Sequence, residues 1–179
     1  MRERTVFTAA LLAAALMGVT GQAGAATPTG TITHHDQTGT RTCLDSPDHA
    51  DEASGTRVIL WDCHGGANQQ WEFVKEAGTG FFDSDRTGVF RIGGKCLDAY
   101  GGSTAAGTPV ILWDCHGGPN QRWTHYGLRG LITLAGTGSS ACLVRAGSGT
   151  PVNGTQLVIA PCEPRSGAWE LGSALLARG

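Results

Sequence analysis

A short apolar run occurs twice in the chain, as Val58-Ile59-Leu60-Trp61 and as Val110-Ile111-Leu112-Trp113. Runs of this length, rich in β-branched and aromatic residues and flanked by glycine and polar residues, are typical of β-strands. Successive side chains of a strand point to opposite faces, so Val and Leu share one face and Ile and Trp share the other. We expect the first face to belong to the core and the second to be partly open.

Each run lies inside a longer repeated stretch, 55–71 and 107–123, in which 14 of 17 positions are identical at an offset of 52 residues. A weaker third copy contains the aligned run Leu157-Val158-Ile159-Ala160, where the inward-facing type is retained and the Trp has become Ala. In all three copies a Gly-Thr pair lies eight residues before the second cysteine. The sequence therefore predicts three homologous units, called repeats 1, 2 and 3, at about 30–75, 76–126 and 127–172.

The six cysteines fall two to a repeat, at separations of 20, 19 and 20 residues. Pairing within each repeat predicts the disulfides Cys43–Cys63, Cys96–Cys115 and Cys142–Cys162, each worth roughly 3 kcal/mol in the chain-entropy model. The alternative is a zinc site at the Asp-Cys-His segments 62–64 and 114–116. Because C-x-x-C spacing is absent and repeat 3 lacks the His, we expect no metal site.

The five tryptophans divide into two classes. Trp71, Trp123 and Trp169 occur in every repeat and are expected in a shared core, although a binding role is the alternative reading. Trp61 and Trp113 are lost from repeat 3 and are therefore not needed for packing, which makes them candidates for function.

Composition adds the fold class and the compartment. The chain has 28 glycines and only 16% charged residues, against roughly 25% in an average domain, which indicates an all-β domain of short strands. The absence of a basic run argues against nucleic acid. Residues 1–25 read as a signal peptide with an A-x-A site, since the apolar run is shorter than the roughly 18 residues of a membrane anchor. We expect a secreted, extracellular chain with one domain, 26–179, and no membrane span once the signal is removed.

The repeated pattern C-L-D, G-T, L-W-D-C and N-Q-x-W resembles the ricin B-type lectin family, which includes carbohydrate-binding module family 13. The resemblance covers essentially the whole chain after the leader. It implies a β-trefoil with pseudo-three-fold symmetry, in which six strands close a short barrel and six form hairpins that cap it.

The resemblance also implies sugar-contacting positions in repeats 1 and 2. They are the acid after Cys-Leu, the aromatic before Asp-Cys, the His after that Cys, the Asn of Asn-Gln, and the Gln that braces the pocket. In repeat 1 these are Asp45, Trp61, His64, Asn68 and Gln69; in repeat 2 they are Asp98, Trp113, His116, Asn120 and Gln121. Repeat 3 departs from the pattern at Val144, Ala160, Glu163 and Gly167, so we expect a purely structural lobe.

The residue types suit a pyranose, which has an apolar C–H face and a rim of hydroxyls. Trp supplies a flat platform, Asp accepts strong hydrogen bonds, and Asn both donates and accepts. The alternatives are that Asp45 and Asp98 are solvated loop acids and that His64 and His116 are simply exposed turn residues. Ile59 and Ile111 stand where many relatives carry Gln, which leaves the identity of the sugar open.

We expect a lectin module without catalytic activity or cofactor, with two sites for a galactose- or xylose-type glycan. Glycoside hydrolysis needs two carboxyls flanking one bond, whereas the candidate acids lie one per repeat. A non-catalytic protein-interaction or inhibitor β-trefoil is the alternative function, because fold alone does not fix function. A separately encoded glycosidase is a possible partner, since relatives are often appended to such enzymes.

Overall fold

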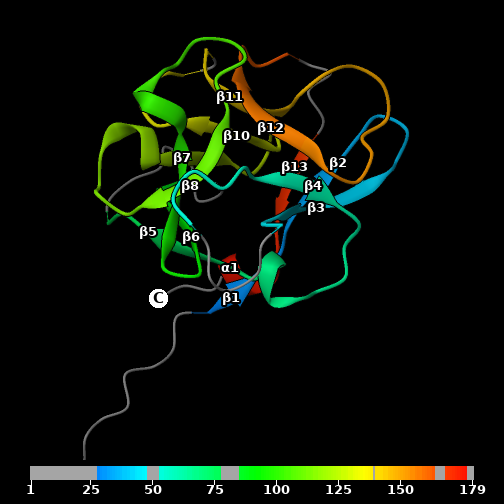
Figure 1. The fold of residues 1–179 in the computed structure, drawn as a ribbon, viewed down its shortest axis with the longest axis horizontal. Helices are drawn as coiled ribbons and strands as arrows, with labels where there is room; N and C mark the ends of the chain where they lie inside the picture. The colour runs from blue at the N-terminus through cyan, green and yellow to red at the C-terminus, as the bar shows by residue number, and fades with distance from the viewer. Residues whose placement is uncertain (1–27, 48–52, 78–84, 139, 164–167, 177–179) are drawn as a thin grey trace, which may run out of the picture.

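The computed structural model describes residues 28–47, 53–77, 85–138, 140–163 and 168–176, so the predicted signal peptide 1–25 lies outside the described residues. Short strands dominate these ranges, together with three single-turn 3-10 helices and one short α-helix (Figure 1). The strands are β1 (Thr29–Gly30), β2 (Ile32–His35), β3 (Arg41–Asp45), β4 (Ile59–Trp61), β5 (Trp71–Lys75), β6 (Asp85–Ile92), β7 (Lys95–Ala99), β8 (Val110–Asp114), β9 (Trp123–Tyr126), β10 (Leu131–Leu134), β11 (Cys142–Arg145), β12 (Thr155–Ala160) and β13 (Ala168–Leu171). The helices are η1 (Ala67–Gln69), η2 (Tyr100–Gly102), η3 (Pro119–Gln121) and α1 (Ser173–Leu176).

A closed ring of antiparallel strands forms the barrel. β1 pairs with β5, β5 with β6, β6 with β9, β9 with β10, and β13 with β2. A hydrogen bond from the backbone N–H of Trp169 to the carbonyl of Gly130, at 2.8 Å, joins β13 to the start of β10. β1 and β2 are two parts of one strand interrupted at Thr31, so the barrel has six strands.

Three hairpins, β3–β4, β7–β8 and β11–β12, lie over one end of this barrel. Their registers are equivalent, because the first cysteine of each repeat is opposite Trp61, Trp113 or Ala160. The hairpins also bond to one another: the N–H of Val58 donates to Val110 O and the N–H of Leu157 donates to Val58 O, each at 3.1 Å. This arrangement is the expected β-trefoil with pseudo-three-fold symmetry.

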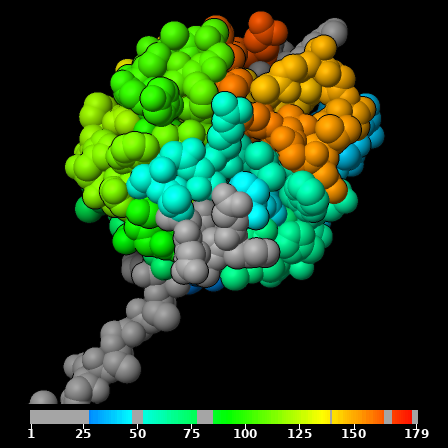
Figure 2. All heavy atoms as spheres, in the orientation of Figure 1, coloured from blue at the N-terminus to red at the C-terminus, as the bar shows by residue number. Residues whose placement is uncertain are grey.

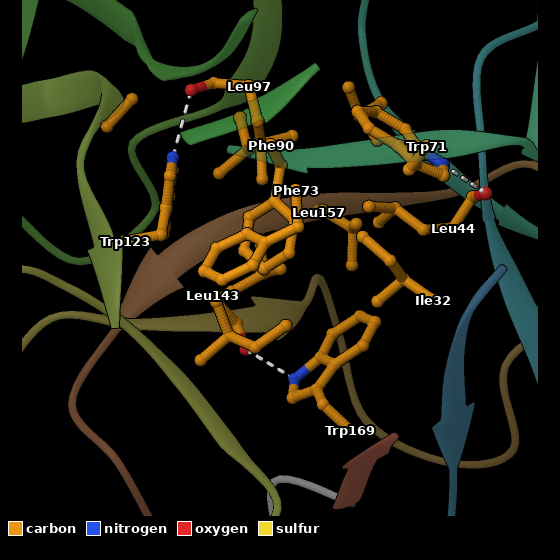
Figure 3. Packing of buried hydrophobic residues seen from close by; sticks show 14 of the residues in the cluster. Ile32, Leu44, Trp71, Phe73, Phe90, Leu97, Trp123, Leu143, Leu157 and Trp169 are labelled. Atoms are coloured by element: carbon orange, nitrogen blue, oxygen red, sulfur yellow. Dashed lines mark hydrogen bonds between the residues drawn. The ribbon is translucent and has the colours of Figure 1, made fainter. Parts of the chain in front are cut away.

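The core lies between barrel and hairpins, and a tryptophan from each repeat enters it (Figure 3). Trp71, Trp123 and Trp169 are at most 3% exposed. Each indole N–H donates to the carbonyl of the Leu that follows the first cysteine of its own repeat, at 2.9–3.0 Å. A buried tryptophan needs such a partner for its N–H, so the repeated Leu backbone and the repeated Trp form one structural unit, and the predicted core role is confirmed.

The three disulfides are those predicted, Cys43–Cys63, Cys96–Cys115 and Cys142–Cys162. Since all six cysteines are paired, none is a thiolate available to zinc.

The apolar runs differ from simple alternation in one respect. Val58 and Leu60 are fully buried as expected, but Ile59 is also buried at 8% exposure while Trp61 is 40% exposed. Ile59 is paired on one side with Asp45 of β3 and on the other with Gln156 of β12, so its strand has neighbours at both edges. The outer face of this strand is therefore open only at the tryptophan, and the same holds at Ile111 and Trp113.

The α-helix α1 packs against the start of the barrel. The Leu175 side chain is buried, and a Cβ added at Gly30 would lie 3.2 Å from it. No helix within the described ranges has the length and apolar content needed to cross a membrane.

Candidate functional site

The five candidate residues of repeat 1 are together called site 1, and three of them, His64, Asn68 and Gln69, surround the carboxylate of Asp45. Asp45 ends β3 and is 2% exposed. Asn68 Nδ2 donates to both carboxylate oxygens at 3.1 Å, and Gln69 Nε2 donates to Oδ2 at 2.7 Å. Burying a carboxylate requires such compensation, so the acid is a positioned acceptor and not a solvated loop residue.

Gln69 is fully buried and ties the turn together. Its Nε2 also donates to the carbonyl of Asp62 at 2.9 Å, while its Oε1 accepts the backbone N–H groups of His64 and Gly65 at 2.9 and 3.2 Å. The helix η1 orients Gln69 toward Asp45, and Trp71 in the core anchors the chain two residues later. Gln69 therefore braces the site from beneath and has no exposed surface with which to contact a sugar.

His64 lies at the rim, with 43% of its side chain exposed. Its Nδ1 accepts the N–H of Gly66 at 3.1 Å, so the proton of the neutral ring belongs on Nε2. Nε2 lies 3.4 Å from Asp45 Oδ2. The imidazole is thus oriented by the turn and directed at the acid, which makes it more than a freely exposed turn residue.

Trp61 supplies the open apolar surface beside this polar cluster. It ends β4, opposite Cys43, and the disulfide at Cys63 follows two residues later. Cys43 and Asp45 belong to the same strand, so the disulfide, the acid and the indole are held at fixed separations.

The candidate residues of repeat 2, called site 2, reproduce this geometry. Asp98 Oδ2 accepts from Asn120 Nδ2 and Gln121 Nε2, both at 2.9 Å, and lies 3.4 Å from His116 Nε2. Gln121 is fully buried, and Trp113 is 39% exposed. The two sites are therefore assembled in the same way.

Repeat 3 has the same backbone without the same chemistry. Val144 is buried at the position of the acid, and Ala160 stands opposite Cys142 at the position of the platform. Glu163 is exposed at the His position, and Gly167 lies outside the described residues. A hollow of about 390 Å³ lies beside this repeat, lined by His34, Asp36, Gln37, Thr38, Arg145, Ser148, Gly149 and Thr150. It contains none of the predicted site residues.

The acids that follow the platforms, Asp62 and Asp114, were not predicted as site residues. Asp62 is bonded to Asn153 of repeat 3. Asp114 is paired with Lys95 Nζ at 2.5 Å, and Lys95 also donates to Ser54 Oγ at 3.3 Å. Hydrogen bonding to Lys95, and then to Ser54, lowers the pKa of Asp114. The repeated W-D-C motif was the available signal, but it does not reveal these different partners.

Comparison with known proteins identifies the relatives of this structure. The chain is 40% identical to the probable lipoprotein EnvE of Salmonella typhimurium over 73 residues, which are 40% of this chain and 38% of that protein. It thus spans well under half the length of that curated relative.

Among solved structures, the agglutinin of Abrus precatorius is similar with a TM-score of 0.60 and 26% identity, over 82% of this chain and 48% of the agglutinin chain. ThreeFoil, a designed three-fold symmetric protein, is similar with a TM-score of 0.58 and 24% identity, over 80% of this chain and 96% of its own. The model of the ricin-type β-trefoil lectin domain matches residues 13–91 and 86–174. With nearly the whole chain matched and the fold in agreement, the chain belongs to the ricin-type β-trefoil lectin domain family, a family of carbohydrate-binding domains.

Proposed function

We propose that the chain is a secreted lectin that binds glycans at two places, site 1 and site 2, and that repeat 3 has no sugar pocket of its own. The observation that carries this proposal is that repeats 1 and 2 each have an exposed Trp and a buried, multiply bonded Asp on two paired strands. Repeat 3 keeps the strands, disulfide and core Trp but lacks both members of that pair. Selection for folding alone does not account for this difference.

The acceptor geometry suits hydroxyl groups. Within the described residues, the donors to Asp98 converge on Oδ2, which leaves Oδ1 to accept hydroxyl hydrogens of a ligand. A charged acceptor makes stronger hydrogen bonds than a neutral one. The neighbouring indole of Trp113 offers a flat face to ring C–H groups. A pyranose presents both features, and we propose a galactose- or xylose-type unit.

Two sites on one rigid domain serve a polymer or a glycan-coated surface better than a free sugar. We expect each site alone to bind sugar weakly. Linked sites gain avidity of about 10² to 10⁴ when both are engaged. Export through the leader 1–25 brings the lectin to extracellular glycans.

A retention experiment with tryptophan variants tests this function. The exported chain is screened on a glycan array and then applied to galactose resin and insoluble xylan. We expect Trp61→Ala and Trp113→Ala to weaken retention singly and to abolish it together. Leu128→Ala is the control, because Leu128 is 83% exposed and belongs to neither site.

The double variant keeps its fold, since both tryptophans are surface residues, and an unchanged melting temperature verifies this. If the double variant is retained as well as the parent, the two sites are not the sugar sites. If the parent binds no glycan on the array, the alternative function as a non-catalytic protein-interaction or inhibitor domain is favoured.

A further inference from the structure

The Gly-Thr pair of each repeat belongs to a tight turn that is the same in all three. In each turn the N–H of the Thr donates to the carbonyl three residues earlier, at 2.9–3.1 Å. The Gly has φ of 85–100°, as the third residue of a type II turn requires. The turns run from Ala53 to Thr56, from Ala105 to Thr108 and from Val152 to Thr155.

Each turn lies against the hairpin of a different repeat. The N–H of Gly55 donates to Leu112 O at 2.8 Å, that of Gly107 to Ile159 O at 2.8 Å, and that of Gly154 to Leu60 O at 3.0 Å. The turn of repeat 1 therefore borders site 2, and the turn of repeat 3 borders site 1. Figure 2 shows the cyan surface of repeat 1 in contact with the green surface of repeat 2 on one side and the orange surface of repeat 3 on the other.

In repeat 3, the residue before the turn glycine makes side-chain contacts with the residue that follows Trp61. This residue is Asn153, whose Oδ1 accepts the backbone N–H of Asp62 at 2.8 Å and whose Nδ2 donates to Asp62 Oδ2 at 2.9 Å. These two bonds join residues 91 positions apart and fix the backbone directly after Trp61. They bind both the main chain and the side chain of Asp62, so Asp62 is held from two directions.

Site 2 obtains the corresponding support by other means. The equivalent of Asn153 is Ser54, which is too short to make the same two bonds, and the ammonium of Lys95 holds Asp114 instead. A Cβ added at Gly55 would lie 3.9 Å from the Trp113 ring, so this turn also lies beside its platform. The two sites have nearly identical motifs, but different residues hold the acid that follows each exposed tryptophan.

We propose that repeat 3 completes site 1, with Asn153 as the positioning residue that fixes Asp62 and thereby Trp61, while Ser54 and Lys95 support Trp113 in site 2. This inference rests on the proposed function of the two sites. It gives the repeat that lacks a pocket a direct part in sugar binding. It also makes the two sites non-equivalent in affinity.

Chains with only one intact site test separately the support that each site receives from its neighbouring turn. Trp113→Ala leaves only site 1 and Trp61→Ala leaves only site 2. We expect Asn153→Ala to weaken glycan binding about three- to tenfold in the Trp113→Ala chain, because Trp61 is then positioned less precisely for the ligand, and to have no effect in the Trp61→Ala chain. Ser54→Ala is the matched control, since it alters the equivalent turn. We expect it to weaken glycan binding only in the Trp61→Ala chain.

A second measurement needs no glycan. In a ¹⁵N spectrum of the otherwise unmodified chain, we expect Asn153→Ala to shift or broaden the indole N–H signal of Trp61 and to leave that of Trp113 unchanged; the two tryptophan variants assign these signals. The inference is overturned if Asn153→Ala weakens glycan binding equally in the Trp113→Ala and Trp61→Ala chains, or if it leaves the Trp61 signal unchanged. The two-site function stands in either case. A parent chain without glycan binding instead removes the proposed function, and the Trp61 signal then decides only whether Asn153 positions the indole.

Discussion

Gln69 holds Asp45 in the interior of repeat 1 with a hydrogen bond of 2.7 Å between Nε2 and Oδ2, and the same amide accepts the N–H of His64 at 2.9 Å. A single side chain thus orients both the acid and the turn that carries the imidazole. Gln121 makes the same contacts to Asp98 and His116. The link between fold and binding site in repeats 1 and 2 is therefore one buried amide.

Removing that amide should damage both stability and binding. Gln69→Ala leaves a buried carboxylate with one donor fewer and two turn N–H groups without their acceptor. We expect the free energy of unfolding to fall by about 2–3 kcal/mol, because hydrogen bonds to charged groups are worth about 1.5–3 kcal/mol. Urea unfolding measures the loss. Gln70→Ala is the control, since among the described residues the Gln70 side chain makes a single long bond, to Gly65 O at 3.4 Å. A loss as large in this variant contradicts the bracing role.

Gly66→Ala should remove sugar binding from site 1 while leaving the backbone of the turn intact. The backbone at Gly66, with φ −63° and ψ 165°, suits any residue. An added Cβ would lie 2.8 Å from both Asn68 Oδ1 and His64 Cε1, so these two side chains must move while the turn remains. We expect affinity to drop about tenfold or more in the Trp113→Ala background, since a site needs its groups held within about 0.5 Å.

The matched control for this change is the same substitution in repeat 2. At Gly118 an added Cβ would lie 2.6 Å from His116 Cε1, so Gly118→Ala disturbs site 2 and leaves the Trp113→Ala background unaffected. Titration of both variants with one glycan distinguishes them. Equal affinities would show that the His and Asn positions do not contribute to binding.

The two classes of tryptophan should respond differently to a conservative change. Trp71→Phe removes the N–H bond to Leu44 O at 3.0 Å and leaves a space in the core. We expect a loss of about 2–3 kcal/mol from the hydrogen bond and the lost packing. Trp61→Phe should stay within about 0.5 kcal/mol of the parent, as surface substitutions usually do. Chemical unfolding of both variants checks this contrast, which disappears if Trp61 is a packing residue.

Acidification should destabilise the protein through His125. Burial lowers the pKa of this imidazole below its ordinary value of 6.5, and the nearby Arg86 adds to the effect, although the bond to the Trp169 carbonyl and the charge of Asp85 oppose it. Below about pH 6.5 the unfolded chain therefore binds a proton that the folded chain resists, so the stability contributed by neutral His125 is present above this pH and lost below it.

Melting temperatures at pH 7.5 and 5.5 measure this dependence. We expect the parent to lose stability over this interval and His125→Gln to lose less. The carboxyls with lowered pKa, such as Glu76 beside Arg122, titrate at more acidic pH and do not contribute in this window. A pH dependence that is the same in both proteins assigns the effect to other histidines.

The sequence was sufficient for the features that each repeat carries by itself. The cysteine pairs and the core position of Trp71 and its counterparts followed from comparing the three copies. The approach of Asp45 to Asn68 also lies within one repeat, but it was implied by the family resemblance and not by the repeat pattern. The burial of Ile59 was not predictable from alternation, because its strand is paired with the strand of another repeat, where Ile59 is opposite Gln156. The interruption of the first strand at Thr31 also has no signal in the repeat pattern.

Contacts between repeats were the part that the sequence did not reveal. The motifs around Trp61 and Trp113 are almost identical, yet Asp62 is bound by Asn153 and Asp114 by Lys95. Lys95 and Asp114 belong to the same repeat, whereas the contact of Asp62 with Asn153 depends on which repeats become neighbours when the barrel closes. It requires three-dimensional adjacency across 91 residues.

The pairing of β4 with β12 has a consequence for biosynthesis. Site 1 is encoded first, but its border comes from residues 153–155, near the end of the chain. A nascent chain that has emerged only through repeat 2 contains Trp61 without Asn153, whereas Ser54 and Lys95, which support Trp113, have already been translated. Site 1 therefore cannot be completed until repeat 3 has been translated, although its tryptophan precedes that of site 2.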